Sequence, residues 1–189
     1  MEKLDLTKLS KATTKKFKNA LKLVIKDKDT LHPNLRGVYF KNDTTINKQY
    51  IIGSNGKVAI VYIIDDMPIE FYDKVINKNG EVISDIYPTL QVPSEFTDII
   101  DLDKNILKTL YEQATSEIKE IGINTKIELV TIPIGEGIEI DYNYYKDFMK
   151  MLDMVGTYNL YYNKSWGTIA ISYTNDKSIL GLILNNLKI

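Results

Sequence analysis

Apolar and polar residues alternate along residues 31–64, LHPNLRGVYFKNDTTINKQYIIGSNGKVAIVYII, with turn residues between the apolar runs. This pattern predicts three strands, at residues 35–41, 49–52 and 57–64. Asn55 and Gly56 predict a tight type I′ turn between the last two strands, because both residue types tolerate the positive φ of that turn. The stretch therefore indicates an antiparallel meander.

A helical pattern precedes this meander. Residues 3–6 predict a short strand, Thr7 or Ser10 can cap the helix that follows, and helical spacing continues to about residue 26. At 100° per residue, Phe17 and the other apolar residues fall on one side, which predicts the buried face. The lysines gather on the opposite side and form a lysine stripe: Lys8, Lys11, Lys15, Lys18, Lys22 and Lys26.

The lysine stripe contains no acidic residue, since no Asp or Glu lies between Lys8 and Lys26. Pairs with acids three or four residues away are therefore absent, and nothing within the helix offsets the repulsion between the lysines. One interpretation is a solvated basic surface, which is what charge runs usually are. The other is a surface that meets phosphate, because lysines on successive turns would present ammonium groups along about 25 to 30 Å.

The middle of the chain, residues 65–122, interrupts the pattern and is interpreted as an inserted segment. Short strands are predicted near residues 71–72, 75–76 and 82–86, around a turn at Asn79-Gly80. A second helix is predicted from Asp103, a good cap, to residue 121, because Gly122 would end it. Its outer face mixes lysine and glutamate, as an ordinary solvated face does.

The first elements of the pattern return after residue 122. Strands are predicted at residues 126–132 and 138–140, separated by Pro133. A helix is predicted at residues 141–155, with Tyr145 and Phe148 on its inner face and Lys146 and Lys150 on its outer face. Three more strands are predicted at residues 158–162, 167–173 and 178–184. A strand, a helix and three antiparallel strands thus occur twice, which predicts one α+β domain over residues 1–189 with related halves at 1–64 and 123–189.

The amino-acid composition is that of an ordinary globular protein. The 189 residues are 44% hydrophobic and 26% charged, as in globular proteins. The lack of cysteine excludes disulfides and thiolate metal sites and agrees with a cytoplasmic location. The charged start and the short apolar runs predict neither secretion nor a membrane span. A net charge of −1 argues against a wholly basic surface and still allows a local basic patch.

Enzymatic chemistry is not predicted. The single histidine, His32, precedes Pro33 in a loop, and no serine-nucleophile motif or phosphate-binding glycine loop is present in the sequence. No cofactor is expected. Four acids could collect a divalent cation, although acids after a strand are usually solvated loop residues. They are Asp65, Asp66, Glu70 and Asp73.

The segment TKKFKNALKLVIKDKDTLHPNLRGVYFKN, followed by YIIGSNGKVAIVYI, resembles the opening half of a DNA sliding clamp domain of the bacterial polymerase III beta-subunit type. In that family a helix and a proline-containing loop lead into a Leu-x-Gly-aliphatic strand, here Leu35 to Val38 after Pro33. A later Thr-Asp-Gly turn of the family corresponds here to Ser54-Asn55-Gly56. The segment IEIDYNYYKDFMKMLDMVGTYNLYYNKSWGTIAISYTNDKSILGLIL is similar to the second half of such a domain.

The resemblance implies a pseudo-twofold fold whose helices face duplex DNA, with Lys146 and Lys150 adding to the lysine stripe. It implies a processivity factor or scaffold that binds double-stranded DNA without sequence preference, together with a DNA polymerase or other replication proteins. A ring of single domains would be a homo-oligomer of about six copies. The alternative is a non-enzymatic α+β interaction module without a DNA role, such as a phage accessory or assembly protein.

Overall fold

The structure is a computed structural model. It describes residues 2–24, 33–56, 58–87, 98–100, 103–125, 128, 130–135, 138–155, 158–163, 168–173 and 179–185, with residues 98–100, 104, 134–135, 138 and 150–185 described by their backbone alone. The chain divides into two compact units. The first comprises Met1–Val92 and Asp176–Gly181, and the second comprises Pro93–Asn175 and Leu182–Ile189.

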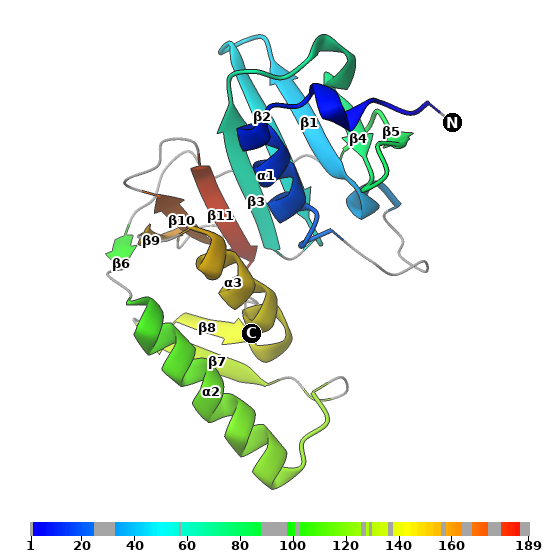
Figure 1. Ribbon diagram of the computed structural model, residues 1–189. Coiled ribbons are helices and arrows are strands. Elements are labelled where there is room, and N and C mark those ends of the chain that lie inside the picture. The colour runs from blue at the N-terminus through cyan, green and yellow to red at the C-terminus, as the bar shows by residue number, and fades with distance from the viewer. Residues whose placement is uncertain are drawn as a thin grey trace. The chain divides into compact units, whose positions relative to one another are not determined.

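An antiparallel sheet forms the first unit (Figure 1). Its strands have the order β5-β4-β1-β2-β3. They are β1 (Val38–Asp43), β2 (Lys48–Ser54), β3 (Val58–Ile64), β4 (Lys74–Ile76) and β5 (Val82–Ser84). The predicted meander is confirmed. Its first strand begins later than predicted, because Pro33–Arg36 form a 3-10 helix, η2.

Helix α1 (Lys11–Ala20) packs against β2 and β3. Ser10 caps it by accepting a hydrogen bond from the backbone N–H of Thr13 at 3.2 Å. The helix was predicted to extend to residue 26, and this is wrong for the described residues 21–24. After Ala20 the backbone hydrogen bonds span three residues instead of four, as in the bond from Leu23 N–H to Ala20 O at 3.1 Å. Residues 25–32, including His32 and Lys26, lie outside the described residues.

The segment before α1 also differs from the prediction. Only Lys3 makes a β-bridge, to Glu81, and residues 6–8 form the 3-10 helix η1 (Leu6–Lys8) instead of continuing a strand. The reason is local: the carboxylate of Asp5 accepts hydrogen bonds from both the N–H and the hydroxyl of Thr7, at 3.0 and 2.7 Å. This side-chain cap bends the chain into a helical turn.

The core between α1 and the sheet is aromatic. The ring of Phe40 in β1 lies 5.5 Å from that of Phe17 in α1 and 5.2 Å from that of Phe71. All three side chains are buried. Phe71 belongs to a 3-10 helix, η3 (Ile69–Phe71), and not to the predicted strand, so the segment after β3 returns an aromatic side chain to the core by a turn.

The turn between β2 and β3 is not of the predicted type I′. Gly56 has the positive φ that this turn requires, +85°. The turn also requires a positive φ at Asn55, but the non-glycine residues with positive φ in the described chain are Asn47 and Asp73. The side chain of Asn55 instead accepts the N–H of Val58 at 2.9 Å. Side-chain bonding of this kind builds a wider turn and removes the need for a second positive φ.

The second unit contains two helices, the antiparallel pair β7-β8 and antiparallel strands in the order β11-β10-β9-β6, of which β11 begins in residues assigned to the first unit. The first elements are β6 (Asp98–Ile100), α2 (Lys104–Ile121), β7 (Thr131–Gly135) and β8 (Ile138–Asp141). Next come α3 (Tyr142–Val155), β9 (Tyr158–Asn163), β10 (Thr168–Tyr173) and β11 (Ile179–Asn185). Both helices and the last three strands agree with the prediction.

Strand β7 departs from the prediction. It begins at Thr131, and Pro133 lies inside it, opposite Glu139, where a separator between strands was expected. The pairing with β8 shifts register between Pro133 and Gly135. An irregular position accommodates proline, which has no N–H to donate to a neighbouring strand.

Aromatic packing joins α2 to α3. Tyr111 of α2 stacks on Tyr142 and Tyr145 of α3, with both centroid distances 5.5 Å. The buried hydroxyl of Tyr145 donates a hydrogen bond to the carbonyl oxygen of Leu107 at 2.9 Å. Tyr145 and Phe148 are fully buried, which confirms the predicted inner face of α3.

A helix followed by three antiparallel strands thus occurs in each unit, as α1 with β1–β3 and as α3 with β9–β11. The predicted α+β fold class is confirmed. The segment 65–122 supplies β4 and β5 to the first sheet and α2 to the second unit. The assignment of residues 1–189 to one domain with halves at 1–64 and 123–189 stays a prediction.

Candidate functional site

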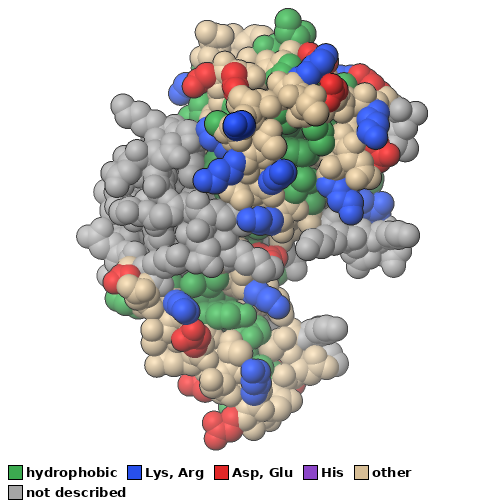
Figure 2. Space-filling view, viewed as in Figure 1, with side chains coloured by type: hydrophobic (Ala, Val, Ile, Leu, Met, Phe, Trp, Pro, Cys, Tyr) green, Lys and Arg blue, Asp and Glu red, His purple; other side chains and the backbone are tan. Residues whose placement is uncertain are grey.

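Three lysines of the stripe lie on the outer face of α1. Lys11, Lys15 and Lys18 are exposed, whereas Thr13 and Phe17 point into the protein. The spacing of three and four residues produces this division, since one turn of the helix takes 3.6 residues. Figure 2 shows basic side chains gathered over α1 on the visible face of the first unit.

Lys22 lies in the turn that follows α1, and it is also exposed. Its ammonium group donates a hydrogen bond to the side-chain oxygen of Asn19 at 3.1 Å. Lys16, by contrast, turns toward the sheet and donates to the carbonyl oxygen of Ile63 at 3.0 Å. Lys16 therefore helps to hold α1 on the sheet, whereas the other lysines of this segment are exposed.

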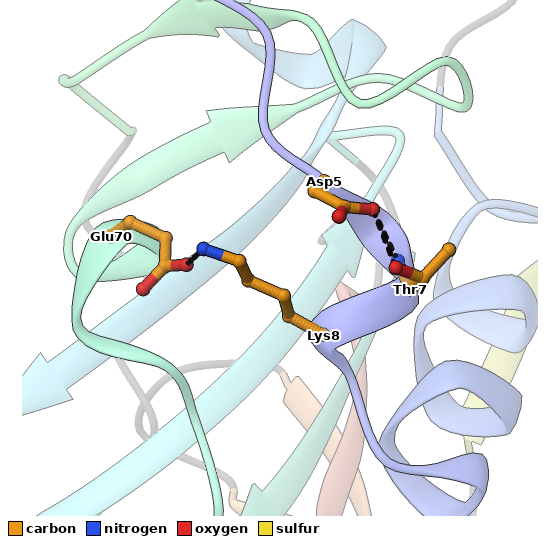
Figure 3. Close-up of polar contacts among 4 residues, drawn as sticks. All are labelled: Asp5, Thr7, Lys8 and Glu70. Atoms are coloured by element: carbon orange, nitrogen blue, oxygen red, sulfur yellow. Dashed lines mark hydrogen bonds and ion pairs between the residues drawn. The ribbon is translucent and has the colours of Figure 1, made fainter.

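Lys8 lies away from the α1 lysines, in η1. Its ammonium group pairs with the carboxylate of Glu70 at 2.6 Å (Figure 3). The hydrogen bond that Lys8 donates to Glu70 raises the pKa of Lys8, and the same bond lowers the pKa of Glu70. The helix predicted to include Lys8 begins only at Lys11, so this member of the stripe has an acidic partner that the local sequence did not reveal.

A groove of about 890 Å³ runs beside α1. Its walls include Lys11, Lys15, Lys18 and Lys22 and a fifth lysine, Lys78, from the turn between β4 and β5. We call these five residues the groove lysines. The lining also contains Leu6, Thr7, Leu9, Thr14, Phe17, Asn19 and Leu21, and no Asp or Glu.

Charge around the groove is locally unbalanced. Within the described part of the chain no ion pair involves a groove lysine, although the whole sequence holds 24 basic and 25 acidic residues. Positive charges gathered around one groove attract an anion more strongly than the net charge of −1 suggests. The groove is therefore a candidate site for a polyanion.

Sequence reasoning missed Lys78. The Asn79-Gly80 turn was predicted, but the position of that turn beside α1 depends on contacts between distant residues. Leu4 N–H donates to Gly80 O at 2.8 Å, and Val82 N–H donates to Glu2 O at 2.9 Å. Pairing of this kind is not visible in local periodicity.

The two predicted lysines of the second unit lie in α3. Lys146 is exposed on this helix, as predicted. Lys150 belongs to the part of α3 that is described by its backbone. A role for either residue in binding stays a prediction.

Three of the four candidate cation ligands, Asp66, Glu70 and Asp73, have structural partners, and that of Glu70 is Lys8. Asp66 accepts a hydrogen bond from the hydroxyl of Thr13 at 2.6 Å, and Asp73 accepts one from the hydroxyl of Tyr39 at 3.2 Å. Burial, followed by the nearby charge of Asp73, raises the pKa of Tyr39 to about 12. Over the described residues no group of three or more His, Cys, Asp or Glu side chains could hold a metal ion.

A membrane span is likewise not found: none of the helices within the described ranges combines the length and the apolar character that crossing a bilayer requires. The longest of them, α2, has 18 residues and carries several lysines and glutamates. Its partly polar surface is that of an ordinary amphipathic helix.

The sequence matches no protein-family model and no curated protein. Solved structures of similar fold are bacterial sliding clamps. The DNA polymerase III subunit beta from Borrelia burgdorferi is 12% identical, with a TM-score of 0.67 over 93% of this chain and 62% of that chain. The DNA polymerase sliding clamp from Pseudomonas aeruginosa is 9% identical, with a TM-score of 0.65 over 96% of this chain and 66% of its own.

A third similar structure is the Helicobacter pylori beta clamp bound to a DNA ligase peptide, which is 14% identical, with a TM-score of 0.60 over 92% of this chain and 62% of that chain. The chain thus spans somewhat less than two thirds of the length of the clamps it matches. At these identities the likeness establishes a clamp-like α+β fold.

Proposed function

We propose that the protein is a clamp-like, non-enzymatic scaffold that associates with duplex DNA through the lysines of α1. The observation that carries the proposal is the set of four exposed lysines, Lys11, Lys15, Lys18 and Lys22, on one groove whose described lining holds no acid. The clamp-like fold supports it independently, because the solved clamps are proteins of DNA replication by their names. Lys146 and Lys150 of α3 would add a weaker contribution.

The lysines would act through charge. Each ammonium group that approaches a phosphate releases a condensed counterion, and this gain does not depend on the base sequence. Phosphate contacts position a protein on the duplex without reading bases, so the scaffold could move along DNA while remaining bound. Such a protein would serve as a processivity factor for a bound enzyme.

The proposed partners follow from the same likeness. The Helicobacter pylori clamp was solved with a DNA ligase peptide, and the partners of this chain would be peptides of a DNA polymerase or of another replication protein. The protein would act in the cytoplasm without a cofactor. A homo-oligomer would supply the additional clamp units that encircling a duplex needs.

The test replaces Lys11, Lys15, Lys18 and Lys22 together by glutamate and measures affinity for a short duplex by fluorescence anisotropy, from about 50 to about 200 mM salt. We expect the wild-type affinity to fall steeply with salt, with a slope of about −0.9 for each phosphate contact. The variant should lose binding at every salt concentration, because four attractive charges become repulsive.

A matched control replaces Lys41, Lys48, Lys108 and Lys119, none of which lines the groove, by glutamate. The change in net charge is the same, and this control should retain most of the affinity. Undetectable duplex binding by the wild type at low salt, or equal affinities for the two variants, would refute the proposed DNA contact. Circular dichroism of both variants verifies that they are folded.

One observation favours the alternative function, a protein-interaction module without a DNA role. The half-buried Leu6 and Leu21 contribute apolar surface to the groove, and phosphate does not require such surface. A peptide with acidic and apolar side chains would use both parts of the lining. Binding of such a peptide, together with no detectable binding of duplex, would favour the interaction module over the scaffold.

A further inference from the structure

The groove beside α1 has a second basic wall that does not belong to the helix. Lys78 is exposed on the turn between β4 and β5, and it lines the same groove as the four α1 lysines. Lys8 was predicted to belong to the basic surface, but its ammonium group pairs with the carboxylate of Glu70 at 2.6 Å. Lys78 supplies a positive charge to the groove instead. The positive charge around the groove therefore comes from two elements of the first unit.

The turn that carries Lys78 is held in place by hydrogen bonds. The side chain of Asn77 accepts the backbone N–H groups of Asn79 and Glu81, at 2.9 and 3.1 Å, and its own amide donates to the Glu81 carboxylate at 2.6 Å. Glu81, the nearest acid in sequence after Lys78, is therefore engaged with Asn77. The charge of Lys78 remains available to the groove.

Gly80 fixes this turn against the start of the chain. It has a φ of +83°, and a methyl group built there would lie 2.5 Å from the carbonyl oxygen of Leu4. Its own carbonyl accepts the N–H of Leu4 at 2.8 Å. The backbone of residues 77–80 is thus packed on residues that lead directly into η1 and α1, which positions Lys78 beside the helix.

We infer that the groove between α1 and the β4–β5 turn seats a phosphodiester backbone, with Lys78 contacting phosphate from the turn and the other lysines contacting it from the helix. The inference rests on the proposed function and deepens it. Lysines on two sides of a groove can approach one strand from both sides, whereas a single helix face can only lie against it. The leucines and the aliphatic lysine stems provide apolar surface for the sugar carbons.

The first experiment compares three single variants, Lys78→Gln, Lys15→Gln and Lys48→Gln. Affinity for a short duplex and for a single strand of the same length is measured over a range of salt concentrations. Loss of one phosphate contact should reduce the salt slope by about 0.9 for the duplex, which corresponds to about eightfold weaker binding at about 0.1 M salt. Lys78→Gln and Lys15→Gln should both show this loss, and Lys48→Gln should not.

The second experiment tests occupancy of the groove without changing the charge of a lysine. The chain has no cysteine, so Asn19→Cys creates a single labelling site in the lining of the groove. A bulky neutral maleimide on this residue should weaken binding at least as much as Lys78→Gln, relative to the unlabelled variant. Thr44→Cys, exposed in the turn between β1 and β2, carries the same label as the control and should bind normally.

The outcomes separate the two proposals. Loss of affinity by Lys78→Gln in either the duplex or the single-strand arm, with the labelled Asn19→Cys variant impaired, supports the groove. If Lys15→Gln binds weakly but Lys78→Gln matches Lys48→Gln in both arms, the groove inference is wrong and the helix contact stands. If Lys15→Gln also matches Lys48→Gln, both proposals are wrong, and an acidic peptide becomes the better occupant.

Discussion

Gly53 determines how closely α1 approaches the sheet. A methyl group at this position would lie 2.5 Å from the carbonyl oxygen of Ala20 and 2.9 Å from its Cα. Both contacts are with backbone, which cannot move aside as a flexible side chain can. The last turn of α1 therefore rests directly on β2, and the side chain of Ala20 is fully buried.

We predict that Gly53→Ala destabilises the protein by about 1 to 3 kcal/mol, because the helix must shift or strain to admit the methyl group. Gly122→Ala is the control. It has open space around the new methyl group but a φ of +76°, so it isolates the backbone cost of about 1 kcal/mol. Denaturant unfolding of both variants measures the difference, and a smaller effect for Gly53→Ala would contradict the steric argument.

Asp66 secures the N-terminus of α1. Hydrogen bonds from Ser10 and Thr13 hold the pKa of Asp66 below its ordinary value of 3.8. Because the folded-state pKa is lowered, these bonds stabilise the protein at pH values above 3.8. The contribution is lost as the pH falls through the folded-state pKa.

Asp66→Ala should therefore lower the free energy of unfolding by about 1 to 2 kcal/mol at neutral pH, since it leaves the buried hydroxyl of Thr13 without this acceptor. Part of the charge effect is screened by solvent, because Asp66 is exposed. The difference between the wild type and Asp66→Ala should shrink as the pH is lowered below 3.8. A difference that grows in acid would contradict this assignment.

Helix α2 has a buried side and an exposed side. Ile106 is 53% exposed, and its neighbour Leu107 is fully buried. Leu107→Ala should cost about 2 to 5 kcal/mol through lost burial and a cavity, whereas Ile106→Ala should change stability by less than about 0.5 kcal/mol. Thermal unfolding of the two variants tests this. Similar melting temperatures would show that the packing of α2 is not as described.

The α-helices and most of the strands could be predicted, because periodicity is a local property, whereas β6 and the 3-10 helices η1 and η3 were not predicted. Phe17, Tyr145 and Phe148 were assigned to buried faces from their spacing alone, and all are buried. The ends of the elements could not be predicted in the same way. The end of α1 lies where its backbone meets Gly53, and the turn after β2 is formed by the side chain of Asn55. Both depend on specific contacts and not on composition.

The candidate site was predictable to the same degree. The exposed face with Lys11, Lys15 and Lys18 follows from helical spacing. Lys8 and Lys78 could not be assigned correctly, because the first is paired with Glu70, distant in sequence, and the second reaches the groove through a turn bound to Leu4 and Glu2. Contacts between distant segments decide which charges share a surface.

At the scale of the whole molecule, the chain corresponds to less than two thirds of each clamp that it resembles. The proposed homo-oligomer would bring additional copies of the clamp-like fold around DNA. We predict that light scattering in the presence of duplex DNA will give a protein mass larger than one chain, 21.7 kDa, after the mass of the bound DNA is subtracted. A strictly monomeric mass with and without duplex would refute a self-assembled ring but would leave the groove contact to be judged by its own variants.

The contact between α1 and β2 has a further consequence, for evolution. The sequence identity to proteins of the same fold is 9% to 14%, and at this level a sequence alignment gives little evidence of a relationship. A contact with backbone does not depend on overall identity: a sequence that keeps this helix position must keep glycine at position 53, whichever side chain stands at position 20. Distant relatives that keep this helix position should therefore keep this glycine, which offers a signature for identifying them.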